Sequence, residues 1–299
     1  MNQVFEVELH DGFKMKGNAF LVDKGVANFV FITGMQEYSM RYKRLAEYLN
    51  ENKVNVYILD HIGQGENVSS VEDQQKVTPG AFDRTVEGLY LTILKAKENG
   101  LPTTQAGHSM GSFMTQARLE RYPGAADKTL IVGSNGGQAF LMKLGYFLAS
   151  IIVNKKNWDK PNKFLSNLGL GGYTKAIKDR KTDLDWLSYN EENVQKYIAD
   201  PYCGHPNTSG FWKEFLKGMR ILWSKKEMSK IQKGEKVLIT SGEEDPVGQC
   251  GKGLKWLQEK YLALGVESEL KLYPHMRHEI HNEDNYLEVY KDWLDFILK

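Results

Sequence analysis

A serine set between two glycines, where a short strand meets a helix, constrains this chain more than any other feature. Gly107-His108-Ser109-Met110-Gly111 follows a predicted strand at 103–107 and precedes a helical pattern. A serine at so tight a turn has a strained backbone, and side chains two residues before and after it would collide. The G-x-S-x-G pattern therefore favours a nucleophilic serine carried on a sheet, and the alternative is an ordinary glycine-serine turn.

Strand and helix patterns alternate along most of the chain. Apolar and polar residues alternate on both sides of an Asp11-Gly12 turn, which predicts a β-hairpin. Thr78-Pro79 predicts a helix start, with Thr78 as the N-cap and Pro79 at the first helical position. Strands are predicted at 26–32, 54–59, 103–107, 130–132, 237–240 and 270–273, and further helices at 41–50, at 254–264 and at the C-terminal end. Alternating βα units imply an α/β fold with a mostly parallel sheet flanked by helices on both faces.

The stretch 138–232 does not follow this alternation. It is rich in aromatic residues and helical patterns, such as Phe211, Trp212 and Phe215, and it has no clear buried strand. We therefore predict a sheet-containing core formed by 1–137 and 233–299, with 138–232 inserted between two strands as a helical cap.

Two apolar stripes at helical spacing run through the predicted cap. They are Phe140, Leu141, Leu144, Phe147, Leu148, Ile151 and Ile152, and Phe211, Phe215, Met219 and Leu222. One interpretation buries both stripes against the sheet domain. In the other, part of this surface lines an acyl-chain tunnel above Ser109 and makes transient contact with a membrane surface.

Composition excludes several kinds of protein. Lys plus Arg number 39 and Asp plus Glu 38, interspersed along the chain, so we expect no nucleic-acid partner. The first twelve residues lack a basic start and an apolar core, and the most apolar run, 140–153, is shorter than the ~18–20 residues that span a bilayer. Cys203 and Cys250 are too few for a disulfide framework or a cysteine zinc site. We expect a cytoplasmic protein without a transmembrane segment, metal or organic cofactor, and the oligomeric state stays open.

A catalytic serine needs a histidine base that is oriented by an acid. Both are expected in loops after later strands, in the chain order serine, acid, histidine. The loop after 237–240 offers three acids, and the region after 270–273 offers three histidines. The candidates are Glu243, Glu244 and Asp245, and His275, His278 and His281. Spacing alone does not choose among them.

The motifs around these candidates resemble those of the monoacylglycerol lipase and lysophospholipase branch of the α/β-hydrolases, the serine aminopeptidase S33 family. Asp245-Pro246-Val247 resembles the acid motif of that branch, and Arg277-His278-Glu279 resembles its R-H-E motif. The resemblance covers nearly the whole chain. It implies an α/β-hydrolase fold and a triad of Ser109, Asp245 and His278, and it leaves His275 and His281 to loop packing.

Two further segments resemble motifs of that family. Thr33-Gly34-Met35-Gln36-Glu37-Tyr38-Ser39-Met40-Arg41-Tyr42 resembles H-G-x-x-E-H-S-x-R-Y, with both histidines replaced. The resemblance implies an oxyanion hole made by the backbone N–H groups of Met35 and Met110. Asp60-His61-Ile62-Gly63-Gln64-Gly65 resembles D-H-R-G-x-G, and we interpret it as a structural turn.

Together these features predict a serine carboxylic-ester hydrolase that acts through an acyl-enzyme. Its partner would be a small-molecule ester, a monoacylglycerol, lysophospholipid or similar lipid ester. The same triad would also serve an amidase, a peptidase or a thioesterase. A third possibility is a ligand-binding protein that kept the fold. Dehalogenase and epoxide-hydrolase chemistry is disfavoured, because those relatives place aspartate where Ser109 stands.

Overall fold

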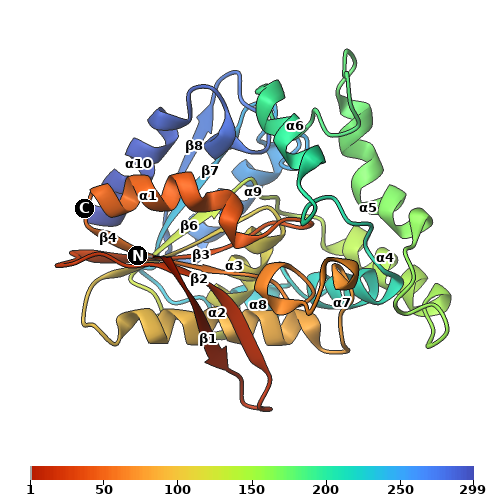
Figure 1. Cartoon of the computed structure of the whole chain (residues 1–299), viewed down its shortest axis with the longest axis horizontal. Coiled ribbons are helices and arrows are strands. Elements are labelled where there is room, and N and C mark those ends of the chain that lie inside the picture. Colours follow the sequence, from red (N-terminus) through yellow and green to blue (C-terminus); the bar gives the residue numbers. More distant parts are fainter. Residues whose placement is uncertain (1) are drawn as a thin grey trace.

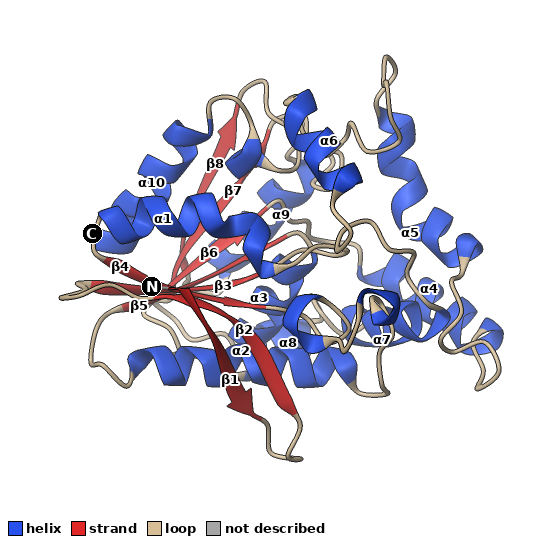
Figure 2. Ribbon diagram, viewed as in Figure 1, coloured by secondary structure: helices blue, strands red, loops and turns tan. Residues whose placement is uncertain are grey.

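Eight strands form one sheet in the computed structural model, which describes residues 2–299, and helices cover both faces of this sheet (Figure 1, Figure 2). The strand order is β1-β2-β4-β3-β5-β6-β7-β8. The strands are β1 Asn2–Glu8, β2 Lys14–Phe20, β3 Ala27–Ile32, β4 Val54–Leu59, β5 Thr103–His108, β6 Lys128–Val132, β7 Lys236–Gly242 and β8 Glu267–Tyr273. β3 to β8 run parallel, whereas β1 pairs with β2 and β2 with β4 in antiparallel orientation. The predicted mostly parallel sheet is confirmed.

The first two strands form the predicted hairpin. Phe5 pairs with Gly17 and Val7 with Met15, around a turn in which Gly12 has φ 79°. Phe5, Val7 and Leu9 are buried, while the alternating residues face solvent. The alternation therefore places one face of the hairpin on the protein core.

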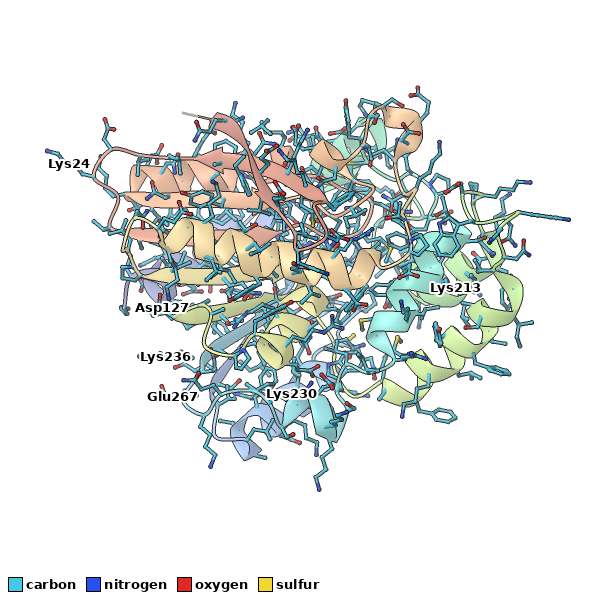
Figure 3. The ribbon with its side chains drawn as sticks, turned by 90° about the horizontal axis from the view of Figure 1, so that it is seen from below. Lys24, Asp127, Lys213, Lys230, Lys236 and Glu267 are labelled. Carbon is cyan, nitrogen blue, oxygen red and sulfur yellow. The ribbon has the colours of Figure 1, made fainter. Side chains whose placement is uncertain are left out.

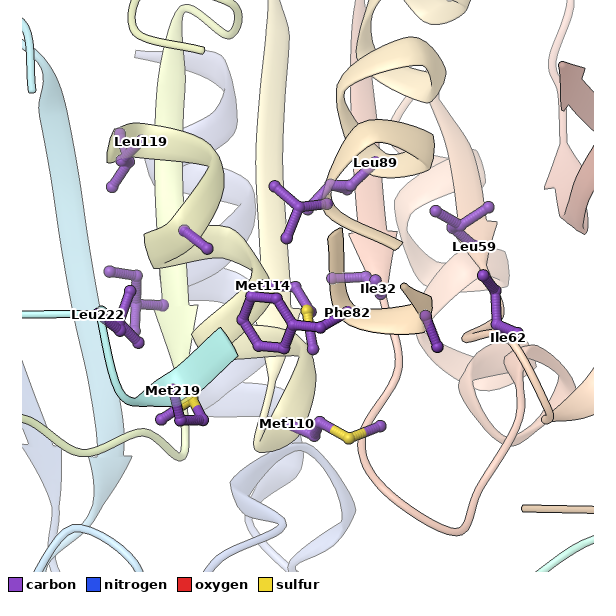
Figure 4. Packing of buried hydrophobic residues seen from close by; sticks show 14 of the residues in the cluster. Ile32, Leu59, Ile62, Phe82, Leu89, Met110, Met114, Leu119, Met219 and Leu222 are labelled. Carbon is purple, nitrogen blue, oxygen red and sulfur yellow. The ribbon is translucent and has the colours of Figure 1, made fainter. Parts of the chain in front are cut away.

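The parallel strands are buried on both faces by two sets of helices. The helices outside the segment between β6 and β7 are α1 Lys43–Glu51, α2 Ala81–Lys97, α3 Met110–Arg121, α9 Lys252–Ala263 and α10 Tyr286–Leu298. α1 and α10 pack on one face, and α2, α3 and α9 pack on the other. Figure 4 shows the second face, where Phe82 of α2 and Met114 of α3 pack beside Ile32 of β3. All residues of β3, β4 and β5 are buried, as strands covered on both faces require.

The start of α2 differs from the prediction. Thr78 does not cap the helix and Pro79 is not its first residue, because α2 begins at Ala81 after Gly80, which has φ 89°. The Thr78 hydroxyl accepts a hydrogen bond from Arg84 instead, and the Gly80 N–H donates to Glu214 of α7. The chain turns at Gly80, in a conformation that glycine adopts without strain, and the helix therefore begins two residues later than predicted.

Between β6 and β7 the chain forms helices, which lie together at one end of the sheet (Figure 1). They are α4 Ala139–Ile152, α5 Lys163–Ala176, α6 Glu191–Ala199, α7 Ser209–Met219 and α8 Lys225–Met228. Within the described residues, the only bridge outside the named strands joins Pro161 to Thr208 in this segment. The division of the chain into a core and a cap at 138–232 stays a prediction.

The first apolar stripe is not buried against the sheet, so that interpretation is wrong for α4. Phe140, Phe147 and Ile151 are 78%, 61% and 67% exposed. α4 packs on α7 through its small residues, and a Cβ on Gly145 would lie 3.1 Å from Leu216. This close approach turns the large side chains outward. We call Phe140, Leu141, Leu144, Phe147 and Ile151 the exposed face of α4.

Charged side chains of both signs cover the outer surface. Lys24, Asp127, Lys236 and Glu267 project into solvent (Figure 3). Lys236 and Glu267 pair in register where β7 and β8 begin. No helix within residues 2–299 has the length and the apolar character needed to cross a membrane.

Candidate active site

Ser109 lies at the turn between β5 and α3, where the sequence predicts it. Its backbone has φ 54° and ψ −118°, a conformation that L-residues rarely adopt. A Cβ on Gly107 would collide with the Gly111 carbonyl and the Thr115 hydroxyl. A Cβ on Gly111 would collide with the carbonyls of Ile32 and Thr33. Both glycines of the motif are therefore required by the packing of this turn.

Asp245 and His278 meet at the ends of the neighbouring strands β7 and β8. His278 Nδ1 lies 3.1 and 3.0 Å from the two carboxylate oxygens of Asp245. Asp245 also accepts hydrogen bonds from the Ser241 hydroxyl at 2.6 Å and from the Val247 N–H at 2.9 Å. Both members of the pair are buried. A carboxylate accepts only, so Nδ1 of the imidazole carries the proton and Nε2 has a free lone pair.

The pair shifts the pKa of each partner in the direction expected of an ion pair. Burial alone would lower the pKa of His278, but the charge of the Asp245 carboxylate and its hydrogen bond raise it above the usual range. Burial alone would raise the pKa of Asp245, but the charge of His278 and the hydrogen bonds from His278, Ser241 and Val247 lower it. His278 therefore accepts a proton readily while Asp245 stays ionised.

The other loop candidates lie elsewhere. The His275 side chain is 94% exposed and lies 3.6 Å from Glu244. The exposed Glu244 accepts a hydrogen bond from Tyr189. His281 is buried and stacks on Tyr42 with 5.0 Å between the ring centroids, and burial lowers its pKa well below the usual range. The buried acid–histidine pair among these candidates is therefore Asp245 with His278, whereas Glu244 and His275 lie near each other at the surface.

Ser109 and His278 line one cavity of about 230 Å³. Among the groups of residues 2–299, His278 Nε2 is buried and has no hydrogen-bond partner. Catalytic hydrogen bonds are often long before substrate binds and shorten in the reacting complex. A serine and an unpartnered imidazole nitrogen in the same cavity are what nucleophilic catalysis needs.

The N–H groups of Met35 and Met110 are the candidate donors to an oxyanion. Both residues line the cavity, beside Ser109. Met110 is the first residue of α3, so its N–H has no acceptor within the helix. The Met35 N–H has no hydrogen-bond acceptor in the part of the chain that the structure describes, residues 2–299. The two donors predicted from the sequence therefore stand free at the cavity.

The two residues that replace family histidines make other contacts. The Thr33 carbonyl accepts from His61 Nε2 at 2.7 Å, and the Tyr38 hydroxyl donates to Asp200 at 3.1 Å. The second contact joins the Met35 loop to the chain after α6. Glu37, which matches the motif, accepts from the Gly34 N–H at 2.5 Å and from the Tyr42 hydroxyl at 2.6 Å.

Aromatic and aliphatic side chains close the cavity. From the β6–β7 segment they are Met142, Leu170, Tyr173, Trp186, Leu187, Trp212, Phe215, Leu216, Met219 and Trp223. The second stripe is therefore divided, with Phe215 and Met219 at the cavity and Leu222 buried in the protein core. Phe147 is exposed and does not line the cavity, so it is not in the part of the two stripes that could line an acyl tunnel.

Sequence reasoning missed the contacts that the chain around α6 makes with the base. The Trp186 ring lies 5.0 Å from the His278 ring, and the Glu279 N–H donates to the Leu187 carbonyl at 2.7 Å. In the sequence, Trp186 and Leu187 stand in a segment rich in polar residues, and such a pair does not identify the residue that it contacts. Within residues 2–299, no three histidine, cysteine, aspartate or glutamate side chains gather as a metal site would require.

The chain is similar to known proteins along most of its length. A family model described as serine aminopeptidase, S33, matches residues 24–285. A monoglyceride lipase homolog of Monkeypox virus is 26% identical over 256 residues, 85% of this chain and 82% of the viral protein. The monoacylglycerol lipase of Mycolicibacterium smegmatis is 25% identical over 270 residues, 90% of this chain and 87% of that protein.

A solved structure of a thermostable carboxyl esterase from Bacillus coagulans, in complex with glycerol, superposes with a TM-score of 0.89. The two sequences are 23% identical, and the match covers 100% of this chain and 99% of that one. At this identity the likeness shows the fold alone. That fold is the α/β-hydrolase fold.

Proposed function

The chain belongs to the serine aminopeptidase S33 family of the α/β-hydrolases, and from this membership we propose that it is a serine carboxylic-ester hydrolase. The observation that carries the proposal is the buried Asp245–His278 pair, 3.0 Å apart, whose free Nε2 shares a cavity with Ser109. A ligand-binding protein would have no use for a buried ion pair beside a strained serine.

The reaction proceeds through an acyl-enzyme. Ser109 Oγ attacks the ester carbonyl while His278 Nε2 takes its proton, and the oxygen of the tetrahedral intermediate accepts hydrogen bonds from the N–H groups of Met35 and Met110. His278 then gives the proton to the departing alcohol. Water attacks the acyl-enzyme with His278 again as base, and the free acid leaves. Asp245 holds the imidazole in the required tautomer and stabilises the imidazolium.

The substrate is a lipid-derived ester, a monoacylglycerol, lysophospholipid or similar compound. The apolar lining of the cavity supports this choice, because an acyl chain gains about 0.8 kcal/mol for each CH₂ it buries. The two curated relatives, a monoglyceride lipase homolog and a monoacylglycerol lipase, also support it. Amides and thioesters with the same acyl chain are the competing substrates, and direct comparison of their kcat/KM separates the three classes.

The segment 138–232 serves as a cap over the triad, and the exposed face of α4 touches the surface of a membrane or lipid aggregate. The support for this contact is the size of its side chains, because large apolar residues at helical spacing seldom face water without a partner. A cap that rests on lipid would admit a monoacylglycerol without exposing its chain to water. The cytoplasmic location expected from the sequence stays a prediction.

Labelling of the nucleophile tests the proposed function. A fluorophosphonate should label the chain once, at Ser109, and Ser109→Ala should remove labelling and ester turnover together. Loss of a triad serine lowers kcat by a factor on the order of 10⁶. Substantial turnover by Ser109→Ala would contradict the assignment, and a wild-type chain that neither reacts with the probe nor hydrolyses esters would point to a binding protein.

A further inference from the structure

The side chain of Gln64 makes three hydrogen bonds to the loop that holds Met35. Gln64 lies in the turn after β4 that we interpreted from the sequence as structural only, and it is fully buried. Its Nε2 donates to the carbonyls of Gly34 and Glu37, each at 2.9 Å. Its Oε1 accepts from the Gln36 N–H, also at 2.9 Å. Two carbonyls need a donor and an N–H needs an acceptor, so these partners fix the orientation of the amide.

The bond to the Gly34 carbonyl sets the direction of the Met35 N–H. These two groups belong to one peptide unit, and within residues 2–299 every peptide bond is trans. In a planar trans peptide the C=O and the N–H point in opposite directions, so holding one directs the other. Gln64 Nε2, by holding the Gly34 oxygen on the far side, turns the Met35 N–H toward the opposite side of the peptide.

Gln64 also holds the residue after Met35 in a strained conformation. Gln36 has φ 63°, in the left-handed region, where a non-glycine residue is disfavoured by about 1–3 kcal/mol. Its N–H is bound to Gln64, and its carbonyl accepts from the Tyr197 hydroxyl at 2.9 Å and the Gly204 N–H at 3.0 Å. Without Gln64, the peptide unit between Met35 and Gln36 would lose the hydrogen-bond acceptor of its N–H.

We propose that Gln64 is a positioning residue for the oxyanion hole, because its amide fixes the peptide units on both sides of Met35 and so aims the Met35 N–H at the reacting carbonyl oxygen. The proposal rests on the ester hydrolysis proposed above. It assigns a role in the reaction to a side chain that touches neither substrate nor triad.

Two substitutions separate this role from simple packing. Gln64→Glu keeps the length of the side chain and the acceptor for Gln36 but places an oxygen against the carbonyls of Gly34 and Glu37. Gln64→Leu removes all three hydrogen bonds without adding charge. Gln74→Leu is the matched control, because Gln74 is also buried and, within residues 2–299, its amide makes no hydrogen bond to Gln64 or to the Met35 loop.

The measurements are kcat and KM on a p-nitrophenyl ester, with rates expressed per titrated active site so that unfolded protein does not count. Removal of one oxyanion donor lowers kcat by ~10²–10³, so a misdirected donor should lower kcat by about tenfold or more in both Gln64 variants. KM should change by less than about threefold, because the acyl cavity is untouched. Gln74→Leu should stay within about twofold of wild type.

Affinity for a trifluoromethyl ketone with the same acyl chain gives a readout that packing alone would not move. This inhibitor forms a tetrahedral adduct with the serine, and the adduct uses the oxyanion donors, so its Ki should rise by the factor by which kcat/KM falls. Binding of the matching fatty alcohol, which forms no oxyanion, should not change. If Gln64→Glu does not fold, the Ki of the ketone and the affinity for the fatty alcohol are compared between Gln64→Leu and the wild type.

Folded Gln64 variants with wild-type kcat and Ki would overturn the role of Gln64 while leaving the hydrolase assignment intact. The same conclusion would follow if Gln74→Leu lost as much activity as Gln64→Leu. Failure of the proposed function has a different signature, because the wild-type chain itself would then not turn over the ester.

Discussion

Arg41 donates to both carboxylate oxygens of Glu279, the residue next to His278, at 2.8 and 2.9 Å. The same guanidinium donates to Glu37 at 2.6 Å, and Glu37 holds the Gly34 N–H of the loop that carries Met35. All three side chains are largely buried. One guanidinium therefore fixes the loop that carries Met35 and the loop that carries His278 relative to each other, although they are far apart in the sequence.

Arg41→Met should destabilise the protein strongly, because it removes the arginine that pairs with the buried carboxylates of Glu37 and Glu279. Breaking a buried ion pair from one side costs about 3–5 kcal/mol of unfolding free energy. Arg180→Met is the matched control, since Arg180 pairs with Asp183 at the surface and should contribute about 0–1 kcal/mol. Urea unfolding at pH 7 measures the unfolding free energy of both variants. Equal losses of unfolding free energy in Arg41→Met and Arg180→Met would show that the buried ion pairs of Arg41 contribute no more than a surface pair.

His278→Ala should lose turnover as Ser109→Ala does, because His278 is the histidine that bonds to Asp245 and the described rings of His275 and His281 make other contacts. His275→Ala should keep wild-type kcat, since its ring is exposed. His281→Ala should keep substantial kcat per titrated active site but lower the melting temperature, because its ring packs on Tyr42. Loss of turnover in His275→Ala with retention in His278→Ala would reassign the base.

Asp245→Asn should lower kcat severely while folding changes little. The asparagine amide favours the wrong imidazole tautomer, an effect on the order of 10⁴ in a related triad. Glu244→Gln is the matched acid-to-amide control, and it should be nearly neutral because Glu244 is exposed and bonds to Tyr189. Steady-state kinetics on a soluble aryl ester measures kcat of both variants. A larger loss of kcat in Glu244→Gln than in Asp245→Asn would assign the role of the acid to Glu244.

The pH profile of kcat/KM should rise through the pKa of His278, because acylation needs the neutral imidazole. The Asp245 carboxylate raises this pKa, so half-maximal kcat/KM on the acid side should lie above the ordinary histidine value of about 6.5. Asp245→Asn removes the charge that raises the pKa, so the midpoint of its residual activity should move to lower pH. Profiles from pH 5 to 10 test both, and a wild-type midpoint below about 6 would contradict the ion pair.

The order of strands and helices was predictable from the sequence because burial on both faces leaves continuous apolar runs, as in β3 and β4. β5 was harder, because Thr103, Thr104 and Gln105 are polar yet buried, and only the following motif indicated a strand. Gln105 is accommodated by a hydrogen bond from Arg118 of α3. Periodicity also showed which residues of α4 share a face but not whether anything covers that face.

The site was predictable only in part. The strand pattern located the two loops, and a family resemblance selected Asp245 and His278 from them. The hydrogen bonds of Gln64 to Gly34, Gln36 and Glu37 were not predictable, because β3 and β4 must pair before the loops after them meet. The contact of Trp186 with His278 likewise depends on how the chain before α6 packs on the loop after β8.

Replacing large apolar side chains on the exposed face of α4 should lower the turnover of substrate in a lipid surface but not the turnover of dissolved substrate. Phe147→Ser and Ile151→Ser should each lower turnover of monoacylglycerol in vesicles by about tenfold or more, because each side chain gains about 1.5–3 kcal/mol on entering lipid. Rates on a dissolved short-chain ester should not change. Leu262→Ser is the control, since Leu262 is 52% exposed on α9 and lies outside the cap segment. Equal losses on both substrates would argue against a lipid contact.

Chain length should govern the rate on dissolved esters until the cavity is full. Each CH₂ buried is worth about 0.8 kcal/mol, which is about fourfold, so kcat/KM should rise steeply from the acetyl ester and then reach a plateau. Aryl esters below their aggregation limit measure this without a lipid surface.

Phe215→Asp places a charge on the cavity wall, whereas Phe147→Asp places one on the exposed face of α4. Phe215→Asp should therefore depress long-chain esters more than acetyl esters, and Phe147→Asp should leave their ratio unchanged. The ratio of the two rates within one variant cancels any loss of folded protein. A wild-type preference for acetyl esters, or equal losses for short and long chains in Phe215→Asp, would mean that the acyl chain lies elsewhere and that Phe215 only packs the cap.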